Sequence, residues 1–200
     1  MALSPRQPLS YRRRVQRIPG FQYHKDFMRL ATLNVATIRG KEEELVELMR
    51  ERKLMVLALA ETRLKENGDK IIHENYRLIH SGTDSGRHGV AFLVAPDVAQ
   101  YVEGFGERII SVDLKLSQGV SIVQVYAPQQ GRPNEEKDEF YQLLHTVVDN
   151  VKHQDRLILC GDWNGHVEDR RNNYENIIGP HSIGNRNEEG QRIIRLCSGE

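Results

Sequence analysis

The sequence has no long apolar run and few cysteines. Its longest uninterrupted apolar stretch, residues 54–60, has seven residues, whereas a membrane-spanning helix needs about 20. No apolar segment of signal-peptide length follows Met1, so we expect no secretion and no contact with a membrane. Two cysteines in 200 residues favour a reduced intracellular compartment, although one disulfide is left open. We interpret Cys160, which lies in an apolar run, as a small core residue.

Acidic residues are absent from the first 25 positions, which carry six bases: Arg6, Arg12, Arg13, Arg14, Arg17 and Lys25. The remaining chain has 22 bases against 28 acids, a net charge of −6. We predict that residues 1–28 form a basic, disordered leader. It could instead contact nucleic-acid phosphates or act as a nuclear or organellar address. We therefore expect an intracellular, nuclear location, with organellar targeting left open.

The net acidity of residues 26–200 argues against tight, non-specific DNA binding by charge alone, because phosphate contacts need Lys and Arg. A nuclease can nevertheless be acidic if a divalent cation supplies positive charge where the phosphate lies.

The chain alternates between strand-like and helix-like segments after residue 28 and contains no internal repeat. Two hundred residues suffice for one domain with a sizeable core, which we place at 29–200. Periodicity and turn signals predict strands at 29–35, 54–60, 76–81, 90–95, 108–116 and 120–127, and another from 157. Helices are predicted at 41–52, 134–151 and 188–197. The fold class is α/β, with several antiparallel strand pairs.

Polar residues lie at the carboxyl ends of four apolar runs: Asn34, Glu61, Tyr126, and Asp162 with Asn164. Ligands gather at the carboxyl ends of strands in open α/β sheets. If the extended backbone continues past Asp162, Asp162 and Asn164 leave the strand on one face. Each residue also has an ordinary interpretation: a loop acid, a packing phenol, or turn formers. Four converging ends favour a site.

This candidate site is rich in oxygen and has no clustered His or Cys, which suits Mg²⁺ or Mn²⁺ rather than zinc. Magnesium takes one or two carboxylates and leaves other positions to water and substrate phosphate. The residue types therefore favour metal-assisted phosphoester chemistry over sugar or acyl chemistry. We expect His166 to lie on the following loop rather than to act as a base.

Four motifs occur in order: Leu33-Asn34-Val35, Ala60-Glu61-Thr62, Val125-Tyr126-Ala127-Pro128 and Gly161-Asp162-Trp163-Asn164. Together they resemble the endonuclease/exonuclease/phosphatase superfamily over about residues 29–200. A closer resemblance is to the endonuclease domain of non-LTR (LINE/RTE-type) retrotransposons and to vertebrate proteins of the craniofacial development protein 2 type. Three stretches carry it: 61–63, 108–112 and 184–192.

The resemblance implies a four-layer α/β sandwich, in which two packed β-sheets are flanked by helices, and hydrolysis of DNA phosphodiesters by an activated water. It implies that Glu61 binds the metal directly and that Asn34 lies beside it. Tyr126 would hydrogen-bond the scissile phosphate. Asp162 would orient and deprotonate the water, and Asn164 would donate to a phosphate oxygen. Arg186 and Asn187 are further candidates, for contact with the nucleic-acid backbone.

The superfamily site also includes a further Asp and a final His, usually in a Ser-Asp-His run on strands after the last helix predicted here. The sequence has no such run. We therefore expect a domain that lacks its last C-terminal strands and has impaired activity. Two alternatives stay open: a phosphatase of the same superfamily acting on a lipid or inositol phosphate, and a non-catalytic binding domain for protein or chromatin. The stretch 184–192 argues against the phosphatase. Oligomeric state is not predicted.

Overall fold

A computed structural model of the chain describes residues 13–14, 28–82, 85–96, 98, 101–104, 106–115, 119–168, 171 and 173–199, with the backbone alone described at 13–14, 101–104 and 115. These residues form two compact units. The first contains the described residues up to Tyr126 together with Tyr141–Asp162, and the second contains Ala127–Phe140 and the described residues from Trp163 onward.

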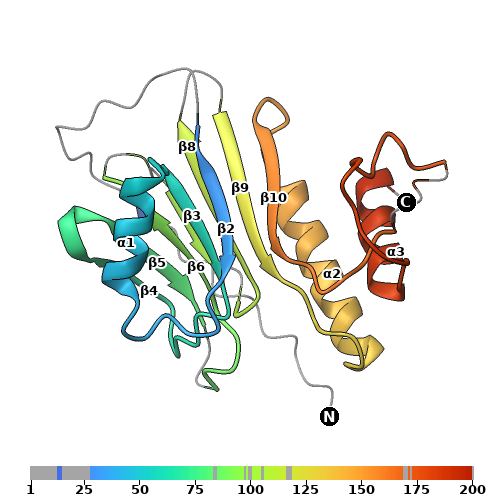
Figure 1. Cartoon of the computed structure of the whole chain (residues 1–200), viewed down its shortest axis with the longest axis horizontal. Coiled ribbons are helices and arrows are strands. Elements are labelled where there is room, and N and C mark those ends of the chain that lie inside the picture. The colour runs from blue at the N-terminus through green and yellow to red at the C-terminus, as the bar shows by residue number, and fades with distance from the viewer. Residues whose placement is uncertain are drawn as a thin grey trace, which may run out of the picture. The chain divides into compact units, whose positions relative to one another are not determined.

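Two five-stranded sheets make up the first unit (Figure 1). One has the order β2-β3-β6-β5-β4, formed by Leu30–Asn34, Val56–Ala60, Val90–Val94, Arg77–Ser81 and Gly68–Ile71. In it β2 and β3 run parallel, and the other neighbours run antiparallel. A one-turn 3₁₀ helix, η1 (His73–Asn75), separates β4 from β5.

The second sheet has the order β1-β7-β8-β9-β10, formed by Arg13–Arg14, Tyr101–Gly104, Ile109–Lys115, Gly119–Tyr126 and Arg156–Asp162. Here β9 and β10 are the parallel pair, and the other neighbours are antiparallel. Each sheet therefore has one parallel pair, and the residues of the candidate site lie at the ends of those pairs.

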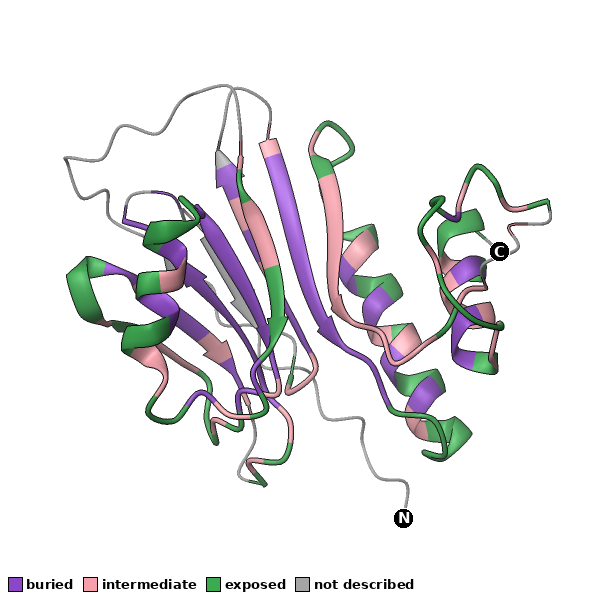
Figure 2. Cartoon of the chain, in the orientation of Figure 1, coloured by how far each residue is buried: buried purple, intermediate pink, exposed green. Residues whose placement is uncertain are grey.

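The core lies between the two sheets, where β3 and β6 face β8 and β9. Every residue of β3 and β6 is buried, as Figure 2 shows. Such strands do not alternate between apolar and polar residues because both of their faces are covered. Phe92, Leu57 and Ile122 are fully buried in this core, and each contributes about 1.5–3 kcal/mol through burial of its side chain.

Helices cover the outer faces of the sheets. Helix α1 (Glu42–Glu51) buries Leu45, Val46 and Met49 in the core of the first unit. Its first turn is acidic and its last turn contains Arg50, which complements the helix dipole. Helix α2 (Asn134–Asp149) begins in the second unit and ends in the first. The predicted four-layer α/β class, two packed sheets with flanking helices, is confirmed.

The predicted strands and helices are found, with ends that differ by one or two residues for most elements. The sequence did not predict β1, β4 or β7. Strand β4 reads Gly-Asp-Lys-Ile and has no buried residue, so no apolar pattern marks it. The predicted buried face of β8 is present at Ile110, Val112 and Leu114, whereas Leu116 lies outside the described residues.

Arg13 and Arg14 form the short strand β1 beside β7. The other residues of the basic leader, up to residue 27, lie outside the described residues, so the leader and the location that it suggested stay predictions. No helix in the described part of the chain is long and apolar enough to cross a membrane. Both cysteines are free: Cys160 is half-buried against the core, as predicted, and Cys197 is exposed.

Candidate active site

The carboxyl ends of both parallel strand pairs meet within the first unit. Asn34 is the last residue of β2 and lies opposite Ala60, so Glu61 follows at the end of the neighbouring strand. In the other sheet, Tyr126 and Asp162 are the last residues of β9 and β10 and are partners in the strand register. The structure thus brings together four of the residues that the sequence singled out.

Hydrogen bonds join these four side chains across the two sheets. The Asn34 Nδ2 group donates to Glu61 Oε1 at 3.1 Å and to Asp162 Oδ2 at 3.0 Å. The Tyr126 hydroxyl donates to the same Glu61 oxygen at 2.8 Å. One amide therefore holds two carboxylates, one from each sheet, and a phenol approaches the first of them.

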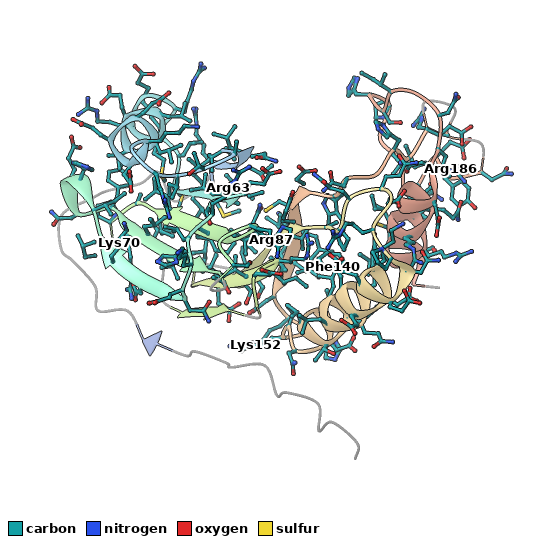
Figure 3. All side chains as sticks on the ribbon, turned by 90° about the horizontal axis from the view of Figure 1, so that it is seen from below. Arg63, Lys70, Arg87, Phe140, Lys152 and Arg186 are labelled. Carbon is teal, nitrogen blue, oxygen red and sulfur yellow. The ribbon has the colours of Figure 1, made fainter. Side chains whose placement is uncertain are left out.

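The backbone around Glu61 is unusual. Glu61 has φ 55°, and Arg63, labelled in Figure 3, has φ 55° as well. Residues other than glycine rarely adopt such angles, and they persist where the surrounding structure holds them, often at functional sites. Here the Thr62 N–H donates to the Gly89 carbonyl at 3.0 Å and the Arg63 N–H donates to the His88 carbonyl at 2.8 Å. The loop before β6 therefore fixes the turn that presents Glu61.

Glu61 is ionised at neutral pH. Burial raises the pKa of this carboxyl group. The hydrogen bonds from Asn34 and Tyr126, together with the charge of Arg63, outweigh that effect, so the pKa lies below its ordinary value. Burial, together with the hydrogen bond to Glu61, raises the pKa of Tyr126 to about 12. The phenol consequently keeps its proton and acts as a donor.

Arg108 and His88 support Tyr126, and the sequence did not single out either as a site residue. The Arg108 guanidinium lies 5.4 Å from the centre of the Tyr126 ring and donates to the Tyr126 carbonyl at 3.2 Å. It also lies 3.2 Å from His88 Nε2. A guanidinium only donates, so His88 Nε2 is the acceptor in this contact. The one available signal was the position of Arg108 at the start of the stretch 108–112.

The donor set fits a divalent cation of the magnesium type. Glu61 Oε1 already accepts two hydrogen bonds, while Oε2 lies 3.9 Å from the guanidinium of the exposed Arg63. No three His, Cys, Asp or Glu side chains of the described residues gather to hold a metal by themselves. Magnesium needs only one or two carboxylates. Glu61 meets that requirement. The Ala36 N–H, which donates to Asn34 Oδ1 at 3.0 Å, orients the amide whose Nδ2 group holds Glu61 and Asp162.

Asn164 departs from the expectation that it shares a strand face with Asp162. Strand β10 ends at Asp162, and Asn164 has φ 49°, so the extended backbone does not continue and that expectation is wrong. Asn164 belongs to the second unit, where its Nδ2 group donates to the Ala127 carbonyl at 2.8 Å. Its role toward a phosphate stays a prediction. His166 lies on the loop that follows, as predicted.

Arg186 and Asn187 lie in the second unit just before helix α3 (Glu188–Ser198). Arg186, labelled in Figure 3, pairs with Glu168 at 2.8 Å and lies 4.6 Å from the centre of the Tyr174 ring. Asn187 is the N-cap of α3 and accepts the Gly190 N–H at 2.8 Å. Both residues thus have contacts within their own unit, and their binding of nucleic acid stays a prediction.

Comparisons with known proteins show what this chain is similar to in family and in fold. The model of the Endonuclease/Exonuclease/phosphatase family matches residues 31–195. Craniofacial development protein 2 of Bos taurus is 28% identical over 174 residues, which are 84% of this chain and 29% of that protein. The chain therefore spans less than a third of the length of the curated relatives that it matches.

Two solved structures illustrate the similarity of fold. The 3′ phosphatase NExo from Neisseria, bound to a product DNA hairpin, has a TM-score of 0.63 and 17% identity over 86% of this chain and 71% of its own. The endonuclease domain of TRAS1, a telomere-specific non-LTR retrotransposon, has a TM-score of 0.61 and 15% identity over 86% of this chain and 71% of its own. At these identities the likeness concerns the fold.

Proposed function

Since the chain belongs to the endonuclease/exonuclease/phosphatase family, as its motifs predicted, we propose that it hydrolyses phosphodiester bonds of DNA with the help of Mg²⁺ or Mn²⁺. The observation that carries this proposal is the joining of Glu61 and Asp162 by one Asn34 amide at the meeting ends of both sheets. The likeness to a retrotransposon endonuclease domain and to a DNA-bound phosphatase supports DNA as the substrate.

Glu61 is the residue that would hold the cation, with Asn34 keeping the carboxylate in place. The cation would supply positive charge at the phosphoryl oxygens, where negative charge grows during hydrolysis. Ionisation of Glu61 at neutral pH suits this role, because the hydrogen bonds that lower its pKa also fix its orientation. Asn34 is then a positioning residue for Glu61 and Asp162 rather than a ligand.

Tyr126 would bind the substrate phosphate. A phenol has one hydrogen to donate, and in this structure the Tyr126 hydroxyl donates its hydrogen bond to Glu61. When the charge of Glu61 is compensated, that bond weakens and the hydroxyl can donate to a phosphate oxygen instead. With its pKa at about 12, Tyr126 keeps the proton throughout the physiological range.

Asp162 would orient the attacking water and accept its proton. The Asn34 amide holds Oδ2, which turns the carboxylate toward the same place as Glu61. A positioned carboxylate of this kind contributes about 10²- to 10⁴-fold to a hydrolysis rate. Asn164 would donate to a phosphate oxygen.

Nicking of supercoiled plasmid in Mg²⁺ tests the proposal. Asp162→Asn and Glu61→Gln should each lower the rate by about 10²-fold or more, whereas Glu43→Gln, at an exposed acid of α1, should not. Glu61→Gln should also weaken Mg²⁺ binding in a calorimetric titration. We expect a low wild-type rate, because the sequence supplies no Ser-Asp-His run. Equal nicking by wild type and both site variants would refute the proposal.

Two further substrates complete the experiment. Turnover of an inositol phosphate without nicking of DNA would replace the proposal with a phosphatase of the same family. Binding of DNA or of a protein without turnover of either substrate would indicate a non-catalytic domain.

A further inference from the structure

The first turn of α3 is fastened to the segment that follows the candidate active-site strand. Asn187 Oδ1 accepts the His166 N–H at 2.9 Å, and the Asn187 N–H donates to the His166 carbonyl at 3.1 Å. The same Oδ1 accepts the Gly190 N–H at 2.8 Å. The Asn187 side chain thus caps the helix and binds the His166 N–H, while the Asn187 backbone N–H binds the His166 carbonyl.

Two glycines allow a close approach at this point. A Cβ atom on Gly190 would overlap the His166 carbonyl oxygen, and a Cβ atom on Gly165 would lie 2.6 Å from Ile193 Cδ1 of α3. Gly190 therefore tolerates no larger residue without movement of the backbone, whereas a larger residue at Gly165 would first displace the end of the Ile193 side chain. The backbone of His166 thus packs directly on Gly190 of the helix.

Helix α3 is in turn anchored to the start of α2. Lys137 and Glu189 form an ion pair at 2.5 Å, and their side chains are only 6% and 5% exposed. A second pair, Arg192 with Asp138 at 2.6 Å, lies on the same two helices. The helix that holds His166 is consequently a fixed support within the second unit.

Asn164 lies two residues before His166 and depends on this support. Its φ of 49° is a conformation that residues other than glycine rarely keep unaided. Its side chain reaches the Ala127 carbonyl at one end of the segment, while Asn187 and Gly190 hold the other end. Because both ends of the segment 164–166 are held, Asn164 has little conformational freedom.

We infer that Asn187 is a positioning residue, which acts through His166 to hold Asn164 in place for reaction with the phosphate. This inference rests on the proposed function. It assigns the stretch 184–192 a task in the second unit in place of contact with the nucleic-acid backbone. Arg186 fits that assignment, because the charge of its guanidinium is compensated by Glu168.

The test compares Asn187→Ala with Asn187→Asp, and uses Asn185→Ala, at an exposed residue of the same loop, as the matched control. Asp keeps the acceptor oxygen and is itself a good N-cap. Asn187→Ala should lower the single-turnover nicking rate by about 10- to 100-fold, leave the affinity for DNA within about twofold, and speed hydrogen exchange of the His166 amide. Asn187→Asp should restore both the rate and the protection.

A second substitution tests the close approach. Gly190→Ala should also lower the rate and speed exchange at His166, although Ala favours a helix more than Gly does. Gly179→Ala, at a position with open space around its Cβ, is its control.

Three outcomes would overturn the inference: weaker DNA binding with an unchanged His166 exchange rate in Asn187→Ala, a nicking rate equal to that of Asn185→Ala, or failure of Asp to restore the rate. A wild-type chain that nicks no faster than Asp162→Asn would instead refute the proposed function. The exchange measurement would then still decide whether Asn187 holds His166.

Discussion

Replacement of Lys137 by Met should destabilise the second unit more than any exposed substitution. Lys137 and Glu189 are almost wholly buried, with the Nζ and Oε1 atoms 2.5 Å apart. Burial raises the pKa of Glu189. The hydrogen bond from Lys137 and the positive charge of Lys137 outweigh that effect, so the pKa lies below its ordinary value. Oε2 of Glu189 is buried and lacks a hydrogen-bond partner among the described residues. The ammonium group is therefore the main compensation for this carboxylate.

Removal of one partner of a buried pair leaves an uncompensated charge and costs about 3–5 kcal/mol. Native domains are stable by only about 5–15 kcal/mol, so Lys137→Met should consume a large part of the free energy of unfolding. The double variant Lys137→Met with Glu189→Leu removes both charges and keeps apolar volume. Its stability should return to within about 1–2 kcal/mol of wild type, because apolar residues often replace a buried pair without loss.

Trp163 is the only tryptophan of the chain and belongs to the second unit, so its fluorescence reports on the unfolding of that unit. In urea, a slope of about 1–3 kcal/mol per M converts the expected loss into a midpoint that is lower by about 1 M or more. Arg195→Met, at an exposed cation of α3, is the control. A midpoint for Lys137→Met equal to that of the control, or a double variant as unstable as the single one, would refute the reasoning.

Three further predictions concern the first unit and the thiols. The pKa of Glu61 lies below its ordinary value of 4.5 in the folded chain. The stabilisation from this group should therefore be complete above about pH 4.5 and be lost as the pH falls through the folded-state pKa. Urea midpoints measured from pH 3 to 7 should show this loss in wild type and not in Glu61→Gln. Gly161→Ala should destabilise by about 1–3 kcal/mol or more, because φ is 135° and the new Cβ would overlap the Val125 carbonyl; a melting temperature equal to that of Gly179→Ala would contradict the clash. Burial raises the pKa of the Cys160 thiol to about 12. A thiol reagent at pH 8 should therefore modify the exposed Cys197 first and Cys160 only after unfolding. Equally fast modification of the two thiols would contradict the burial of Cys160.

The meeting of the strand ends was predictable because its signal is local. Short apolar runs bounded by polar residues or glycine mark β3, β9 and β10. Strands β9 and β10 end on Tyr126 and Asp162, and Glu61 directly follows β3. Parallel pairing then brings the carboxyl ends together at one edge. Nothing beyond residue types and run lengths was required to expect Asn34, Glu61, Tyr126 and Asp162 in one place.

The remaining features depend on contacts that no local pattern records. Arg108, directly before β8, and His88, in the loop before β6, reach Tyr126 from positions distant in sequence. The positive φ of Asn164, which ends the strand geometry, has no marker beyond the residue type itself. The packing of the strands into two sheets was expected from the family resemblance alone. The disordered leader and the divalent cation stay predictions.

The Asn34 amide has a consequence for how relatives of this chain are classified. It ties a carboxylate of one sheet to a carboxylate of the other, so it is a contact between the sheets as well as part of the candidate site. The presence of Asn34, Glu61 and Asp162 in a relative is therefore evidence of shared architecture and does not by itself demonstrate turnover.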